Sequence, residues 1–239
     1  MPAKAVAILL CLLPLVVHAQ EPDIRAQLAP GRFTTLSSEL AARLARVAAR
    51  EGERFAEGDV LITLDCAIQK AQLERARALA GAAEKVLTAN RRLIELNSAG
   101  QLEAVAAAAE AAKARGEVAV MTATLDKCAV KAPFPGVVAE QKARAEQFVQ
   151  PGQPILEILD DSRLEVAFIL PSRLLTGLAV GQPFTVTVDE TGRGYPGVVR
   201  RIKPRVDPVS QSVEVIGEIA GHFPELAAGM SGRLTLVPR

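Results

Sequence analysis

The chain has 239 residues, 49% of them hydrophobic and only 3% aromatic, and its formal net charge is +1 at pH 7. Nucleic-acid-binding domains normally carry a basic excess and often stacking aromatic side chains, so this composition argues against that class. The length allows one or two compact domains together with an elongated element.

Residues 1–19 are predicted to be a cleaved secretory signal peptide. Lys4 precedes an apolar run that ends at Val17, and this run is shorter than the ~20 residues that a membrane-spanning helix needs. Cys11 leaves a lipoprotein signal as an alternative, which the large residue Leu10 before it disfavours. Cleavage would leave two cysteines, Cys66 and Cys128, in a chain bound for an oxidising compartment.

The first segment of the mature chain, residues 20–32, is polar and contains Pro22 and Pro30. It is predicted to be a leader with little structure. Short β-type runs follow at residues 33–36, 43–47 and 60–64.

A sequence motif occurs twice, at residues 55–64 and at residues 149–158. Each copy places a turn glycine, Gly58 or Gly152, before a short apolar strand. Neither half could bury its apolar face alone, so the two copies are expected to meet in space. The segment between them, residues 66–128, is then an insertion whose ends lie side by side, which predicts a hairpin.

The inserted segment has a helical composition, because it is rich in alanine and contains no proline. Its mostly apolar seam residues recur at alternating intervals of 3 and 4 residues. This spacing predicts an antiparallel coiled coil with a tip near residues 96–103. The alternative, an ordinary helical subdomain, is disfavoured because one narrow seam offers too little apolar surface for a globular core. The predicted seam residues are Leu73, Ala76, Ala80, Ala83, Leu87, Asn90 and Ile94, flanked by Leu79, Val86 and Leu93, and in the second helix Leu102, Val105, Ala109, Ala112, Gly116, Ala119 and Ala123.

The β pattern resumes after Cys128 and continues into a second β unit, residues 161–239. Five short strands and one short helix at residues 171–178 are typical of a small barrel or sandwich. The strands are predicted at residues 164–170, 184–188, 197–202, 212–219 and 234–237.

A disulfide is predicted between Cys66 and Cys128. If the two halves pair as the repeat requires, both cysteines lie at the base of the hairpin, where neighbouring Cα atoms can reach the ~4.4–6.8 Å that a bridge needs. Two unpaired thiols at a helix–strand junction are the alternative.

Residues 33–239 resemble the periplasmic adaptor subunits (membrane fusion proteins, HlyD-like family) of tripartite efflux pumps, chiefly of the resistance–nodulation–division type. The resemblance rests on pieces in the expected order: Leu64-Asp65, Ala132-Pro133-Phe134-Pro135-Gly136-Val137-Val138, Val149-Gln150-Pro151-Gly152-Gln153-Pro154, Leu178-Ala179-Val180-Gly181-Gln182, Arg205-Val206-Asp207-Pro208-Val209-Ser210-Gln211-Ser212-Val213 and Leu226-Ala227-Ala228-Gly229-Met230.

The resemblance implies a mixed α+β, elongated fold. A lipoyl-like β domain (33–65 and 129–160) is split by an antiparallel α-helical coiled-coil hairpin (66–128), and a small β-barrel domain (161–239) follows. It also implies a periplasmic protein that links an inner-membrane transporter to an outer-membrane channel, forms a homo-oligomer on assembly and needs no cofactor. Only a short segment precedes Phe33, so the chain is expected to be a short adaptor.

In that family the hairpin tip docks on the channel through a pattern Arg-x3-Leu-x6-Ser. Arg92 and Leu96 fit its first two places, but Glu103 stands at the third, which puts the usual docking mode in question. The alternative for Arg92 and Glu103 is a solvated pair on the hairpin. In the barrel, Arg193 lies in a turn-rich loop and is a candidate for contact with the transporter, with a plain solvated turn as the alternative.

Other functions remain open at this point. A carrier domain would need a lysine at the turn between the halves, where this chain has its hairpin, and no catalytic motif supports an enzyme. The transporter could instead be ATP-driven or part of a type I secretion system, and a non-transport envelope scaffold is a third hypothesis.

Overall fold

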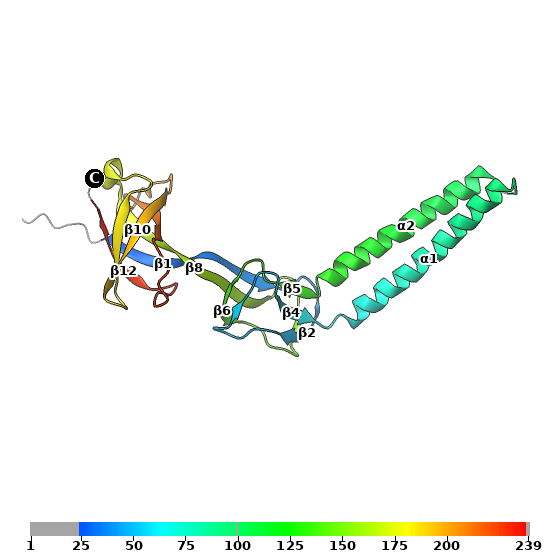
Figure 1. Cartoon of the computed structure of the whole chain (residues 1–239), viewed down its shortest axis with the longest axis horizontal. Helices are drawn as coiled ribbons and strands as arrows, with labels where there is room; N and C mark the ends of the chain where they lie inside the picture. The colour runs from blue at the N-terminus through cyan, green and yellow to red at the C-terminus, as the bar shows by residue number, and fades with distance from the viewer. Residues whose placement is uncertain (1–23, 99, 238–239) are drawn as a thin grey trace, which may run out of the picture.

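The structure, a computed structural model, describes residues 24–98 and 100–237. Three parts follow one another along the long axis of the molecule: a β-barrel, a β unit formed by the two copies of the repeated motif, and a helical hairpin (Figure 1). The predicted signal peptide, residues 1–19, lies outside the described residues. The elements are β1 (Ile24–Ser37), β2 (Ala42–Val47), β3 (Arg54–Phe55), β4 (Val60–Leu64), α1 (Ala67–Glu95), α2 (Gln101–Asp126), β5 (Ala129–Lys131), β6 (Gly136–Gln141), β7 (Phe148–Val149), β8 (Pro154–Pro171), η1 (Ser172–Gly177), β9 (Pro183–Val188), β10 (Arg193–Ile202), β11 (Ser212–Ile219) and β12 (Ser231–Leu236).

The barrel is an antiparallel sheet that closes on itself in the order β1-β12-β9-β10-β11-β8, because β8 also pairs with β1. Closure removes the free edges that an open sheet would expose. Phe168 and Phe184 meet edge to face in its core, with ring centroids 5.8 Å apart. A Cβ at Gly197 or Gly217 would collide with the Phe184 ring, so these two strand positions require glycine.

The prediction of an unstructured leader at residues 20–32 was wrong from Ile24 onward. Residues 24–30 form the barrel part of β1, which pairs with β12 on one side and β8 on the other. Ile24, Ala26 and Leu28 are buried in alternation with exposed Arg25 and Gln27. This two-residue period is the signal of a half-buried strand, and the flanking prolines obscured it.

The β unit between the barrel and the hairpin is built from both copies of the repeated motif. It is called the split β unit below. One sheet has the order β5-β4-β2-β7, and the other consists of β3, β6 and the far ends of β1 and β8. The matched apolar positions of the two copies are buried in one core, and Gly58 and Gly152 share the same left-handed backbone, with φ of 85° and 82°. The prediction that the two halves meet is therefore confirmed.

The hairpin leaves the split β unit at Cys66 and returns at Cys128, and its two helices run side by side (Figure 1). On α1, the expected contact residues Leu73, Ala76, Ala80 and Leu87 are buried. On α2, the expected seam was wrong: Leu102 and Val105 are exposed, and Ala107 and Ala111 are buried instead. The predicted 3–4 spacing of the contact residues was right, but the residues that face α1 lie two positions further along α2 than predicted. A shift of two residues rotates the contact face by about 200° around the helix axis.

The wrong register has a simple physical cause. In the first half of α2 most positions that could face α1 are alanines, so the 3–4 spacing fits several faces there almost equally well, and only in the second half do the half-buried Val118, Met121 and Leu125 continue the face of Ala107 and Ala111. Larger residues normally mark the contact face of a helix, but Leu102 and Val105 point away from α1 here. The outer face of α2 is therefore apolar, a feature that a single helix pair does not explain.

Candidate functional site

The far end of the hairpin is where the predicted docking residues lie. Helix α1 ends at Glu95, Leu96 follows as its cap, and Asn97 adopts a left-handed conformation with φ of 54°. The Ser98 N–H donates to the carbonyl oxygen of Leu93 at 2.8 Å, which closes the helix end. The chain thus turns where the sequence predicted a tip.

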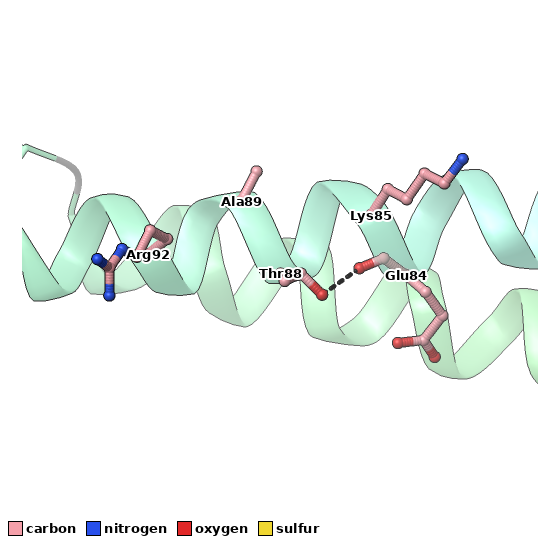
Figure 2. Close-up of a pocket in the computed structure, with 5 residues that line it drawn as sticks. All are labelled: Glu84, Lys85, Thr88, Ala89 and Arg92. Atoms are coloured by element: carbon pink, nitrogen blue, oxygen red, sulfur yellow. Dashed lines mark hydrogen bonds between the residues drawn. The ribbon is translucent and has the colours of Figure 1, made fainter.

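Arg92 is exposed on the last turns of α1 and forms an ion pair with Glu95 of the same helix, with Nη1 2.8 Å from Oε2. It lies at the end of a shallow hollow of about 410 Å³ on the surface of α1, which Glu84, Lys85, Thr88 and Ala89 also line (Figure 2). Leu96, one turn further on, is 58% exposed. Both side chains are free to contact another molecule.

Glu103 lies in the first turn of α2, where it has a structural role. Its Oε2 accepts a hydrogen bond from the Gly100 N–H at 2.8 Å, so the carboxylate caps the start of the helix. A carboxylate there also interacts favourably with the helix dipole. In the described part of the chain no ion pair joins Glu103 to Arg92, and a docking role for these two residues stays a prediction.

The base of the hairpin is fixed by a covalent bond. Cys66 and Cys128 form a disulfide with their Cα atoms 6.2 Å apart, as predicted. Both residues are buried against the core of the split β unit, at 4% and 7% exposure. The bridge ties the start of α1 to the end of α2.

Ion pairs surround the disulfide on both sides. Arg43 of β2 lies 3.0 Å from Asp65 and 2.7 Å from Glu146, and Lys127 after α2 lies 2.8 Å from Glu39. The hydrogen bond from Arg43, together with the Ala67 N–H, lowers the pKa of Asp65 below its usual value. Both ends of the hairpin are therefore attached to the β unit, so the helices are expected to move with it.

Arg193 is the first residue of β10 and pairs with Val188 of β9, directly after the barrel turn that was predicted to hold it. Tyr195 is buried, and its hydroxyl lies 3.2 Å from both Thr191 Oγ1 and Glu225 Oε1. Arg193 itself is 75% exposed, and its Nη1 lies 3.8 Å from Glu225 Oε1, a long ion pair. The guanidinium of Arg193 is thus exposed next to a turn that hydrogen bonds hold in place. Its contact with the transporter remains a prediction.

The described residues contain no group of three or more side chains arranged to hold a metal ion. Within the same residues, no helix combines the length and hydropathy needed to cross a membrane. The features that stand out are surfaces, at the tip, at the barrel loop and along the hairpin.

Sequence reasoning missed two of these surfaces. One is the apolar outer face of α2, and the other is a groove of about 710 Å³ along one flank of the hairpin, between α1 and α2. Leu79 and Val86 line this groove. The seven-residue spacing of these two residues is visible in the sequence, where it predicts only a margin of the seam between the two helices.

Comparisons with known proteins agree with this architecture. The Nodulation protein NolF of Rhizobium meliloti is 29% identical over 227 residues, which cover 89% of this chain and 62% of that protein. The chain spans 55 to 62% of the length of the curated relatives it matches. No protein-family model matches the chain.

Two solved structures are similar over most of the chain. A MacA–MexA chimeric protein, which contains the Pseudomonas aeruginosa MexA α-hairpin domain, has a TM-score of 0.80 at 17% identity and covers 90% of this chain and 81% of that one. The membrane fusion protein Spr0693 of Streptococcus pneumoniae has a TM-score of 0.77 at 16% identity, covering 90% and 98%. These likenesses establish the fold.

Proposed function

We propose that this chain, which has the fold of the membrane fusion proteins, is a periplasmic adaptor of an efflux pump. It would link an inner-membrane transporter, of the proton-driven resistance–nodulation–division type, to an outer-membrane channel. In this proposal residues 1–19 direct export, the split β unit is a lipoyl-like domain, and α1 and α2 form a coiled coil. The similarity to proteins with this fold supports the assignment.

The observation that carries the proposal is the end-to-end arrangement of the three parts (Figure 1). The 29 residues of α1 extend the hairpin by roughly 43 Å beyond the split β unit. The disulfide and the ion pairs of Arg43 and Lys127 attach the hairpin at its base. A long projection that is firmly held at one end suits a protein that bridges two others.

The two ends of the molecule would bind different partners. At the tip, Arg92 and Leu96 are exposed and would contact the channel, while Glu103 would act by holding the first turn of α2 in place. At the barrel, the Arg193 loop would face the transporter. Each contact is small, so several copies acting together would be needed for stable assembly.

The test is the charge reversal Arg92→Asp, with export of a pump substrate as the readout. Arg92 is exposed, and among the described residues its ion-pair partner is Glu95 on the same helix, so the fold is expected to survive. Export is expected to be lost because the reversed charge would disrupt the proposed contact between the tip and the channel. Photocrosslinking from position 96 in isolated envelopes should label an outer-membrane channel.

A matched control is Arg77→Asp. Arg77 forms the same kind of pair, with Glu74 three residues before it, but lies on the lower half of α1 away from the tip. Export should persist in this variant. If Arg92→Asp exports as well as Arg77→Asp at equal protein levels, the tip does not dock in the proposed way.

A further inference from the structure

The split β unit carries a hollow of about 300 Å³ on its surface, apart from the tip and from the barrel turn. Two segments that are distant in the sequence line this hollow. Arg50 and Glu51 follow β2, whereas Gln141 ends β6 and Arg144 lies in the turn after it. A volume of this size is at the lower end of the range for small-molecule sites, which is roughly 300–1,000 Å³.

Both arginines of the hollow lack a charged partner. The side chains of Arg50 and Arg144 are exposed, and neither forms an ion pair or a hydrogen bond with another described residue. A single unpaired arginine on a protein surface is ordinary, but here two line the same hollow. Each guanidinium supplies five N–H donors and a permanent positive charge. Other arginines of the two β parts do pair with carboxylates, among them Arg32, Arg43, Arg54, Arg200 and Arg201.

Glu51 contributes a carboxylate to the lining, and this carboxylate binds the backbone. Its Oε1 accepts a hydrogen bond from the Gln141 N–H at 2.9 Å. In the described part of the chain no ion pair joins Glu51 to either arginine of the hollow. Two guanidiniums and one carboxylate leave the lining with a formal charge of +1. The unoccupied donors and the net charge both favour an anionic ligand.

The two segments that carry the arginines are held in place by their own hydrogen bonds. The Arg50 N–H donates to Glu53 Oε2 at 3.0 Å, and the Glu53 N–H donates to the carbonyl oxygen of Arg50 at 3.0 Å. In the other segment, the Arg144 N–H donates to Gln147 Oε1 at 2.8 Å. The backbone of the hollow is therefore formed before a ligand arrives, so binding has to order only the two arginine side chains.

We infer that this hollow binds a small soluble anion through carboxylate or phosphate groups held between Arg50 and Arg144. The planar fork of a guanidinium matches the paired oxygens of a carboxylate or a phosphate, and such charge-assisted hydrogen bonds are among the strong ones. The site is open to solvent, so salt weakens the attraction. A ligand with two or more acidic groups can contact both arginines at once and binds more tightly than a ligand with one.

This inference is independent of the proposed adaptor function. None of the four lining residues belongs to the tip, to the barrel or to the base of the hairpin. Binding of an anion would assign a ligand to the split β unit even if the tip docks on nothing. Conversely, the absence of anion binding would leave the docking experiment with Arg92→Asp unchanged.

Calorimetric titration of the full-length mature protein tests the site, with citrate as the carboxylate probe and inorganic pyrophosphate as the phosphate probe. Ionic strength is kept constant during each titration. Saturable binding of at least one probe with one site per chain is expected. The affinity should fall when the titration is repeated at higher salt.

Replacement of the two arginines locates the bound anion. Arg50→Gln and Arg144→Gln should each lower the affinity several-fold, and the double variant should abolish binding. The matched control is Arg205→Gln in the barrel, because Arg205 is also exposed without an ion-pair partner among the described residues. This control removes the same charge and should retain the affinity. Unchanged urea midpoints in all variants would exclude loss of folding as the cause.

The opposite change is expected at Glu51. Glu51→Gln removes the negative charge of the lining and keeps an acceptor for the Gln141 N–H, so the affinity should rise several-fold. Three results would overturn the inference: no saturable binding of either probe, affinities that fall equally in Arg144→Gln and Arg205→Gln, or binding that persists in the double variant. An affinity that stays the same or falls in Glu51→Gln would also contradict it, because the anion would then lie away from this carboxylate.

Discussion

Arg32 clamps Asp160 where β1 and β8 pass from the barrel into the split β unit. Its Nε and Nη2 donate hydrogen bonds to Asp160 Oδ2 at 2.9 and 2.7 Å, while Oδ1 accepts from the N–H and hydroxyl of Ser162. The β1–β8 ladder is interrupted at this point, between Pro30 and Arg32. The guanidinium also lies 4.7 Å from the centre of the Phe134 ring in the split β unit. The clamp therefore fixes a joint that the backbone ladder leaves irregular.

Replacing Asp160 by Asn is expected to destabilise the protein by about 2 kcal/mol, because a 5% exposed acceptor of four hydrogen bonds loses its charge. Urea unfolding measures the change. Asp161→Asn is the control, since Asp161 pairs with Arg54, which is well exposed, and such pairs contribute less than about 1 kcal/mol. Equal losses in both variants would show that the Arg32–Asp160 clamp has no special role.

The same clamp predicts a dependence of stability on pH. Burial alone would raise the pKa of Asp160, but hydrogen bonds from Ser162 and Arg32 outweigh it and hold this pKa below its usual value. The folded state thus binds the proton less readily than the unfolded state, where the pKa is about 3.9. The stability that Asp160 contributes is therefore complete above that value and is lost as the pH falls through the folded-state pKa.

The measurement is the difference in free energy of unfolding between wild type and Asp160→Asn at several pH values. The difference should be constant from neutral pH to about pH 5 and should shrink below about pH 4. A difference that stays constant down to the lowest pH at which both proteins fold would contradict the lowered pKa.

The sequence was sufficient for the order of the parts because strong local signals agreed with one another. The repeated glycine turn, the alanine-rich segment and two cysteines all pointed to one hairpin inserted between two β halves. The register of α2 was less clear, because alanine provides little contrast between the faces of the first half of the helix, and Val118, Met121 and Leu125 mark the contact face only in the second half. The contact between Arg32 and Asp160 was also not predicted from the sequence. These residues are 128 positions apart and become neighbours only through the β1–β8 ladder.

The Cys66–Cys128 bridge is expected to contribute substantially to stability. It closes a loop with a sequence separation of 62 residues, which is worth on the order of 4 kcal/mol in the chain-entropy model. Reduction, or the double variant Cys66→Ala/Cys128→Ala, should lower the free energy of unfolding by a comparable amount, measured as a lower urea midpoint. The double variant itself should not respond to reductant. Free, alkylatable thiols in freshly isolated periplasmic protein would show that the bridge does not form in the cell.

Arg193 is expected to contact the transporter, and its replacement should affect assembly and leave stability unchanged. Its ion pair with Glu225 is long and exposed, so Arg193→Glu should cost less than about 0.5 kcal/mol. Copurification with the inner-membrane partner should decrease several-fold. Arg200→Glu is the matched control, because Arg200 is also an exposed barrel arginine paired with a glutamate, Glu218. Equal effects of the two variants would remove Arg193 from the interface.

Glu103 offers a way to separate a capping role from a docking role at the tip. Its carboxylate holds the Gly100 N–H, so Glu103→Ala should loosen the first turn of α2 by about 1 kcal/mol. Glu103→Gln keeps an acceptor for that N–H and should retain most of the cap while losing the charge. Hydrogen exchange at the first amides of α2 measures the cap, and export measures docking. If Glu103→Gln exports normally and only Glu103→Ala shows faster exchange and weaker export, Glu103 acts by shaping the tip. Loss of export in Glu103→Gln with unchanged hydrogen exchange would show instead that the negative charge of Glu103 itself contacts the channel.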